Sequence, residues 1–255
     1  MPDWHSESPA SVASLLASDV EHGLSEAEAA TRLQSGRNEL PQHPLRSPLQ
    51  VLASQFTDTM IVVLLVAAAL AIAMGEAQDS IMILVIAVLN GVLGFVQEYR
   101  AERALAALNR MAAPQAQVVR DGHIRHIPAA ELVPGDVVAL EAGNMVPADV
   151  RLLHSAELSV QESALTGESV PVTKHFATVL PIATPMADRI TLAFQGTLVT
   201  RGRALAMVVA IGQQTELGRI AGMIAAEPGT QTPLQRRLAT LGKQLGVAIL
   251  AICAL

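Results

Sequence analysis

Aromatic and charged residues are both scarce in this sequence. Aromatic residues make up 2% of the 255 residues and charged residues 16%, whereas a soluble domain carries about 25% charged residues. Hydrophobic residues nevertheless reach 51%, and most of them are aliphatic. Because so few charges are available to cover the molecule, we expect part of its surface to contact something other than water.

Several other features are missing. Cys253 is the only cysteine, which excludes a disulfide within the chain and a CxxC metal-binding pair. The formal net charge of −6 gives no basic surface for nucleic acid, so we expect no nucleic-acid partner. The first ten residues contain Asp3 and Glu7 but no Lys or Arg, unlike a secretory signal. The sequence also lacks a GxxxxGKS/T loop for ATP, and no cofactor-binding residue is assigned.

Two apolar runs, 60–74 and 81–96, are the first strong feature. Each falls short of the roughly 20 apolar residues that a bilayer crossing needs, but flanking residues supply the missing length. We therefore expect transmembrane helices at about 56–75 and 80–98. The alternative is a buried helical hairpin within a soluble β-rich binding domain, although little of the remaining chain could cover two such helices.

The charge distribution around these runs predicts their orientation. The short segment between them, 75–80, contains no Lys or Arg. Basic residues occur instead before the first run and after the second, at Arg37, Arg46, Arg100, Arg103 and Arg110. The positive-inside rule then places the 75–80 loop outside and the rest of the chain in the cytoplasm. The segment 97–111 keeps helical spacing and is expected to continue the second span as a stalk.

The two ends of the chain lead to further expectations. At the C-terminus, the apolar stretch 245–255 would form a helix of about 16 Å, roughly half the hydrocarbon thickness. We therefore expect a third span that is cut short by truncation of the sequence. Near the N-terminus, Ser25 and Glu28 have capping-box spacing at the start of a predicted helix, Glu26–Gln34, which Gly36 ends. Helical spacing is also expected for Leu15, Leu16, Val20 and Leu24.

Between residues 115 and 212 the pattern changes to short strands. Asp121-Gly122 is a favoured hairpin turn between the predicted strands Gln117–Arg120 and His123–Ile127. Further strands are predicted at Val137–Glu141, Val150–His154, Val170–Lys174, Leu192–Val199 and Arg203–Ile211. Such regular strands favour a small β-sandwich or barrel, followed by a helix at Glu216–Ala226. The resulting division is 1–48 (helical region and linker), 49–99 (transmembrane hairpin), 100–228 (stalk and β-rich domain) and 229–255.

Three polar turns on this scaffold are candidates for chemistry. Pro134–Asp136 and Pro147–Asp149 are best explained by turn formation, because Pro, Gly and Asp are chosen there for backbone shape. Thr166–Ser169 differs because it places the carboxylate of Glu168 at the tip of a glycine-containing loop, where functional residues are common. A solvated surface carboxylate is the alternative for Glu168 taken alone.

The residues around this loop resemble a known family. The run ESALTGES, Glu162 to Ser169, followed by VPV, is similar to the actuator-domain signature of P-type cation-transporting ATPases. The upstream VPGDVV, EAGNMVPAD and NGVLGFVQEYRAERALAAL resemble the same family in the same order, and the resemblance covers essentially the whole chain. It implies a membrane protein with an α-helical transmembrane hairpin and a cytoplasmic all-β actuator domain, a distorted sandwich (jelly-roll-like) with short flanking helices.

The resemblance also implies a catalytic role for the loop. In this family ATP phosphorylates an aspartate in a separate domain, and the actuator glutamate positions and activates the water that hydrolyses the aspartyl phosphate. By resemblance Glu168 has that role, Gly167 allows close approach of the backbone to the phosphate, and Thr166 and Ser169 shape the loop. Gln161 departs from the family pattern, which often has an acidic residue there, but it lies outside the loop.

Other parts of the family pattern do not occur in this sequence. The DKTGT motif with the phosphorylated aspartate is missing, so ATP and Mg²⁺ are expected to bind phosphorylation and nucleotide-binding domains outside this chain, and the chain alone is expected to be inactive. The absence of an N-terminal CxxC module speaks against the heavy-metal branch of the family. The order of helical N-terminal region, two spans and actuator resembles the type-II, calcium-pump-like branch, which implies a Ca²⁺-like transported cation. We expect a bacterial, multi-pass plasma-membrane protein in contact with the lipid bilayer.

No metal ligand is assigned in the chain itself. Asn90, together with Gly91 and Gly94, is expected to mediate close helix packing, and Glu76 and Asp79 are expected to be solvated loop residues. A membrane-tethered interaction module without catalysis, ending naturally at Leu255, is the alternative function.

Overall fold

The computed structural model describes residues 3–40, 47–57, 59–111 and 114–226, together with 234, 237, 238, 240–242, 244 and 251. The chain divides into two compact units. Residues 1–42 and 113–227 form a β-rich unit, and residues 43–112 and 228–255 form a helical unit. The β-rich unit is thus built from two segments that the helices separate in sequence.

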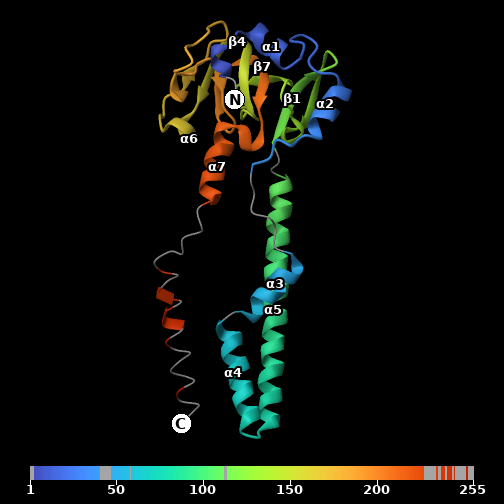
Figure 1. The fold of residues 1–255 in the computed structure, drawn as a ribbon, viewed down its shortest axis with the longest axis vertical. Helices are drawn as coiled ribbons and strands as arrows, with labels where there is room; N and C mark the ends of the chain where they lie inside the picture. The colour runs from blue at the N-terminus through green and yellow to red at the C-terminus, as the bar shows by residue number, and fades with distance from the viewer. Residues whose placement is uncertain are drawn as a thin grey trace. The chain divides into compact units, whose positions relative to one another are not determined.

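An antiparallel sheet forms the centre of the β-rich unit (Figure 1). Its strand order is β2-β1-β3-β7-β4-β5, and β6 pairs with β4. The strands are β1 (Gln115–Arg120), β2 (His123–Pro128), β3 (Val137–Glu141), β4 (Asp149–Gln161), β5 (Val172–Thr173), β6 (Leu192–Ala193) and β7 (Leu198–Ala210). The pairing of β4 with β7 contains several register shifts, and such bulges bend strands. The expectation of a β-sheet domain with short flanking helices is confirmed.

The predicted strands agree with the structure in part. The β1–β2 hairpin turns at Asp121 and Gly122, whose φ angles of 49° and 73° are those of the favoured two-residue turn. The expected strand Leu192–Val199 is instead split between β6 and the start of β7, because the chain turns at Gly196 with φ 80°. The expected strands at 150–154 and 203–211 are parts of the longer β4 and β7, and β5 is shorter than expected.

The sheet buries both of its faces. Neighbouring residues along a strand point to opposite sides, so Val118 belongs to one core and Val119 to the other. The same alternation occurs at Val137 and Val138, and at Leu152 and Leu153. The larger core lies among the strands, and the smaller core lies between the sheet and the N-terminal segment.

The N-terminal segment covers the second face of the sheet with short helices. These are η1 (Trp4–Ser6), α1 (Pro9–Leu15) and α2 (Glu26–Leu33). Val12 of α1 is fully buried against the sheet beside Trp4. Ser25 caps α2 as expected, because its side chain accepts a hydrogen bond from the Glu28 amide.

The expected helical spacing from Leu15 to Leu24 is wrong. Helix α1 ends at Leu15, and Ala17 has a φ of +46°, which an α-helix cannot contain. The Asp19 carboxylate then accepts hydrogen bonds from the amides of Glu21 and His22, which is an Asx-type turn. Leu24 is buried, but it forms a bridge with Arg120 of β1 rather than continuing a helix.

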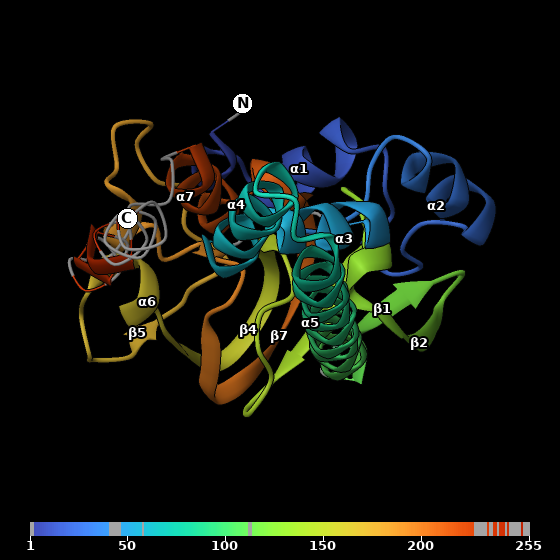
Figure 2. The same cartoon turned by 90° about the horizontal axis from the view of Figure 1, so that it is seen from below.

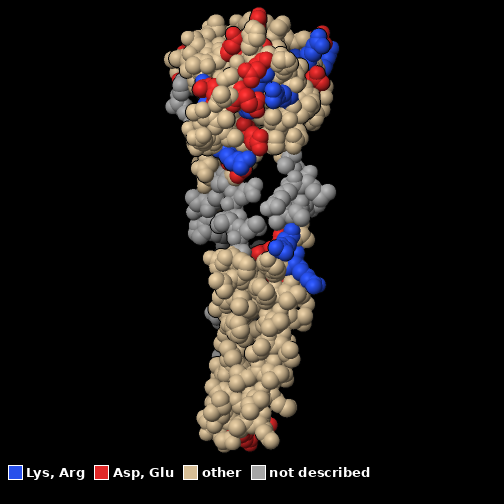
Figure 3. All heavy atoms as spheres, turned by 90° about the vertical axis from the view of Figure 1, so that its right-hand side faces the viewer, with Lys and Arg blue, Asp and Glu red and all other residues tan. Residues whose placement is uncertain are grey.

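The helical unit contains α3 (Pro48–Phe56), α4 (Thr59–Ala73) and α5 (Ala77–Met111). Helix α5 runs on past the second apolar segment, as expected for a stalk. Its part Ala77–Ala104 is long and apolar enough to cross a membrane, and the bent pair of α3 and α4 passes the same test as a second candidate. On the face shown in Figure 3, charged atoms of this unit occur only towards its two ends.

Close packing joins α3 to α5. A Cβ atom on Gly94 would lie 2.3 Å from Gln55 Oε1, and Gln55 Nε2 donates a 2.6 Å hydrogen bond to Glu98 Oε2. Asn90 is exposed in the described structure. Gly94 therefore allows the close helix packing expected around Asn90, Gly91 and Gly94. Apart from Ala251, the predicted third span at 245–255 lies outside the described residues.

Candidate functional site

The Thr166–Ser169 loop follows directly after β4. The end of this strand leads through Glu162 into a single helical turn, α6 (Ser163–Thr166). The Glu162 carbonyl accepts hydrogen bonds from the amides of Leu165 and Thr166, at 2.9 and 3.0 Å, and from Thr166 Oγ1 at 3.1 Å. In Figures 1 and 2, α6 lies at the end of the sheet opposite the β1–β2 hairpin.

Gly167 ends this helical turn. Its φ of +79° is in the left-handed region, which glycine adopts without the steric cost that a side chain brings. A Cβ atom at this position would meet nothing within 4 Å. The backbone conformation therefore gives a reason for glycine here, in addition to the close approach to a phosphate that the resemblance implies.

Glu168 and Ser169 lie on the exposed tip of the loop. The Glu168 amide donates to Thr166 Oγ1 at 3.3 Å, so the Thr166 hydroxyl bridges the helical turn and the tip. Within the described part of the chain, no ion pair or side-chain hydrogen bond holds the Glu168 carboxylate. The four predicted site residues thus form one continuous loop, with its carboxylate directed to solvent and free to meet another domain.

The other two polar turns have structural partners. Asp136 accepts two hydrogen bonds from the Arg120 guanidinium, at 2.9 and 2.8 Å, and a third from the Val133 amide at 2.9 Å. Asp149 accepts from the amides of Gln195 and Glu216, each at 2.8 Å. Burial raises the pKa of Asp149 to about 6, although its two backbone hydrogen bonds act in the opposite direction. Both aspartates connect separate segments of the scaffold.

Sequence reasoning missed one pair of residues at the base of the loop. Lys174 Nζ lies 2.5 Å from Glu162 Oε1, and both side chains are completely buried. The usable signal was an acidic and a basic residue at the two ends of a short polar loop. Charged residues are usually exposed, so this signal alone did not distinguish a buried pair from two solvated groups.

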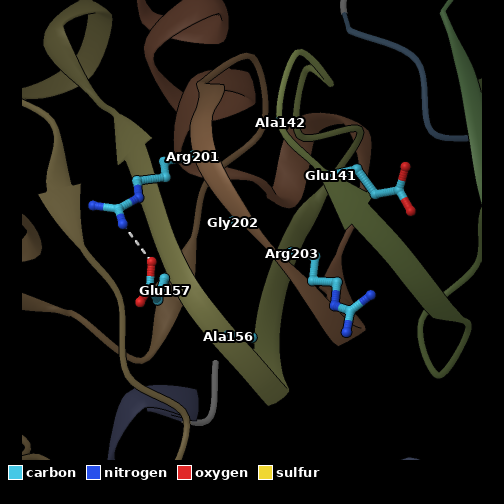
Figure 4. Close-up of a pocket in the computed structure, with 7 residues that line it drawn as sticks. All are labelled: Glu141, Ala142, Ala156, Glu157, Arg201, Gly202 and Arg203. Atoms are coloured by element: carbon cyan, nitrogen blue, oxygen red, sulfur yellow. Dashed lines mark hydrogen bonds and ion pairs between the residues drawn. The ribbon is translucent and has the colours of Figure 1, made fainter.

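An open hollow occurs elsewhere on the β-rich unit. Glu141, Glu157, Arg201 and Arg203 surround it together with Ala142, Ala156 and Gly202. Figure 4 shows Arg201 directed towards Glu157. None of the predicted site residues lines this hollow. Among the described residues, no group of three or more His, Cys, Asp or Glu side chains is placed to hold a metal ion.

Comparison with known proteins agrees with this arrangement. The family described as the P-type ATPase actuator domain matches residues 110–225, and the one described as the cation transporter/ATPase N-terminus matches residues 4–71. The fold and the loop thus define the N-terminal and actuator regions of an ion-pump-type protein. The chain belongs to the P-type cation-transporting ATPase family.

Curated relatives match nearly the whole chain. Calcium-transporting ATPase 1 of Bacillus cereus is 42% identical over 99% of this chain, and the probable cation-transporting ATPase F of Mycobacterium tuberculosis is 47% identical over 94%. Calcium-transporting ATPase type 2C member 1 of Mus musculus is 39% identical over 92%. The chain spans 29%, 27% and 26% of the length of these three proteins, respectively.

Proposed function

We propose that this chain provides the actuator and first membrane helices of an ATP-driven cation pump, in which Glu168 assists hydrolysis of an aspartyl phosphate. The observation that carries the proposal is the exposed Glu168 carboxylate, unpaired among the described residues, at the tip of a loop on a well-packed β scaffold. An exposed tip can enter the active site of another domain, whereas a buried or paired acid could not.

The reaction follows from the chemistry of a carboxylate. Water attacks the phosphorus atom, the bond between phosphorus and the aspartate oxygen breaks, and the aspartate leaves as a carboxylate. Glu168 accepts the proton that the water loses. General-base assistance of this kind accelerates a reaction about 10²- to 10⁴-fold. Gly167 permits the turn, while Thr166 and Ser169 shape it for approach to the phosphate.

The remaining components come from outside this chain. ATP, Mg²⁺ and the phosphorylated aspartate belong to the phosphorylation and nucleotide-binding domains of the complete pump. A Ca²⁺-like cation is the proposed cargo, because the relatives from Bacillus cereus and Mus musculus are named calcium-transporting ATPases. ATP hydrolysis by the complete pump that rises with Ca²⁺, and not with Na⁺ or K⁺, is the expected outcome of an ion-dependence assay.

The proposed location is the plasma membrane, with the N-terminus and the β-rich unit in the cytoplasm. Among the described residues, helix α5 and the bent pair of α3 and α4 are candidates for crossing the membrane. Lys and Arg are absent from the 75–80 connection and present on the other side of both helices, as the positive-inside rule requires for a cytoplasmic β-rich unit.

The substitution Glu168→Gln tests the catalytic role. Residues 1–255 would replace the matched segment of the Bacillus cereus relative, so that a complete pump carries the variant. We expect phosphoenzyme to form from ATP but to decay at least about 100-fold more slowly, since the amide cannot accept the proton. The decay of ³²P-labelled phosphoenzyme measures this rate.

The control is Glu141→Gln, an exposed glutamate on β3 of the same unit. It is expected to leave the decay unchanged. Normal decay in Glu168→Gln would contradict the proposal and favour a membrane-tethered interaction module without catalysis.

A further inference from the structure

The loop that carries Glu168 is closed at its base by a buried ion pair. Glu162 is the last residue before α6, and Lys174 is the first residue after β5. Their side chains have no exposed surface, and Nζ lies 2.5 Å from Oε1. Between them, residues 167–171 are all exposed. The charged pair is therefore inside the domain, and the tip 167–171 of the segment between them is outside.

Both ends of the loop are also fixed to the sheet. The Lys174 amide donates to the Leu158 carbonyl of β4 at 2.8 Å, and Lys174 Nζ lies 5.6 Å from the centre of the Phe194 ring. At the other end, the Glu162 carbonyl organises α6 through three hydrogen bonds. A shift of Glu162 would consequently be transmitted through α6 to Gly167 and the tip.

The two charges depend on each other. In the described structure, no hydrogen bond from any further group reaches either carboxylate oxygen of Glu162, so Lys174 alone balances its charge. Burial raises the pKa of Glu162 and lowers the pKa of Lys174, and the opposite charge of the partner counteracts both shifts. Removing one member leaves an unpaired buried charge, whereas replacing both with well-packed hydrophobic residues of similar volume is often neutral for stability.

A buried ion pair is weak evidence of stabilisation, so the presence of this pair calls for another explanation. Exposed tip residues make few contacts of their own, so the position of Glu168 depends on the base of its loop. Catalytic groups must be held to within a fraction of an ångström, and a misplacement of 1 Å can lower the rate about 100-fold.

We propose that the Glu162–Lys174 ion pair is a clamp that positions the Thr166–Ser169 loop for dephosphorylation. This inference rests on the proposed function of Glu168 and adds two positioning residues to it. The clamp holds the two ends of the loop together and keeps α6 in place, so that the Glu168 carboxylate meets the phosphate in one orientation.

Paired substitutions in the same chimeric pump test the clamp. The double variant Glu162→Leu/Lys174→Met removes both charges, and we expect phosphoenzyme decay to slow at least about tenfold. Its thermal unfolding, followed through the fluorescence of Trp4, is expected to remain close to that of the wild type. Trp4 is the only tryptophan of this chain and packs on the β-rich unit, so its fluorescence reports unfolding of that unit. The measurement uses the purified 255-residue chain in detergent, where no other tryptophan contributes.

Glu162→Asp provides a second test that keeps both charges. This substitution shortens the side chain by one methylene group and is also expected to slow phosphoenzyme decay about tenfold. Lys174→Arg retains the reach and the charge of the side chain, so its decay rate is expected to stay within about threefold of that of the wild type. The matched control is Glu157→Gln/Arg201→Gln, which removes an ion pair that is also 2.5 Å long but exposed. Normal decay in this control is expected.

Cleavage of the 255-residue chain gives a readout independent of catalysis. We expect a glutamate-specific protease to cut after Glu168 at least about fivefold faster in the double variant, because an unclamped loop samples more conformations. Normal decay in both the double variant and Glu162→Asp, with unchanged cleavage, would overturn the clamp. If Glu168→Gln slows decay and these variants do not, only the clamp fails. If Glu168→Gln also decays normally, the proposed function fails.

Discussion

At the scale of single residues, Gly167 is the position of the loop at which the backbone itself requires glycine. An alanine with φ of +79° is strained by about 1 kcal/mol, although its Cβ atom would meet no neighbour within 4 Å. We expect Gly167→Ala to lower the free energy of unfolding by about 1 kcal/mol and to slow phosphoenzyme decay, because relief of this strain moves Glu168. Trp4 fluorescence and phosphoenzyme decay measure the two effects.

Gly143→Ala is the matched control for this substitution. Gly143 has φ of +93° and also has no atom within 4 Å of the added Cβ, but it lies in a different turn. A similar loss of stability with unchanged decay is expected. Equal decay rates for both variants would show that the conformation of Gly167 has no part in catalysis.

Asp149 gives the β-rich unit a predicted pH dependence. Burial raises its pKa from 3.8 to about 6, so the folded state binds the proton more tightly than the unfolded state. The contribution of Asp149 to stability is therefore largest below pH 4 and falls by about 3 kcal/mol as the pH rises to 6 and beyond. Unfolding of the wild type and of Asp149→Asn should be compared by Trp4 fluorescence between pH 4.5 and 7.

Asparagine cannot titrate, so only the wild type gains stability from protonation at this position. As the pH is lowered from 7 to 4.5, the free energy of unfolding of the wild type should therefore rise relative to that of Asp149→Asn. A difference that is constant over this range would contradict the raised pKa.

The residues of the candidate site differ in how far sequence could predict them. Glu168 could be placed at an exposed tip, because a glycine-containing turn and the family resemblance both indicate it. Glu162 and Lys174 could not be recognised as a buried pair. Their contact depends on how β4 and β5 meet, and this pairing is a property of the folded sheet rather than of local spacing.

At the scale of elements, local chemistry predicted the hairpin and β3 well. Asp121-Gly122 alone specifies the turn between β1 and β2, and β3 begins and ends as expected. The predictions failed where tertiary contacts outweigh periodicity. Leu24 has the spacing of a helical residue, yet it forms a bridge to β1 and is buried against Ala29 and Val133.

The Arg120–Asp136 pair joins β1 to the turn before β3, and its loss should loosen both elements. Both side chains are almost completely buried, and Asp136 accepts three hydrogen bonds. We expect Asp136→Ala to lower the free energy of unfolding by about 3–5 kcal/mol, because it leaves the Arg120 charge buried without its partner. Thermal unfolding of the chain, followed by Trp4 fluorescence, measures the loss.

The exposed Glu157–Arg201 pair serves for comparison here as well. Glu157→Ala should cost less than about 1 kcal/mol, since exposed ion pairs contribute little. Losses of equal size in the two variants would show that burial does not determine the value of the Arg120 pair.

At the scale of the whole molecule, the order of segments in the sequence differs from their order in space. Residues 1–42 belong to the β-rich unit, although the helical unit separates them from residues 113–227. The sequence could predict helices and strands on either side of the membrane segments. It could not show that Val12 and Trp4 complete the second core of the sheet, because no local pattern links them to strands more than a hundred residues away.

This division makes membrane topology a test of the entire interpretation. If α5 and the bent pair of α3 and α4 cross the membrane, the 75–80 connection faces outward and the β-rich unit faces the cytoplasm. In a Cys253→Ser background, a membrane-impermeant maleimide should label Gln78→Cys in intact cells. Ala142→Cys, which is also exposed, should be labelled only after permeabilisation. Equal labelling of both positions in intact cells would place the β-rich unit outside and separate Glu168 from any phosphate in the cytoplasm. Release of the chain by a carbonate wash would contradict the membrane hairpin.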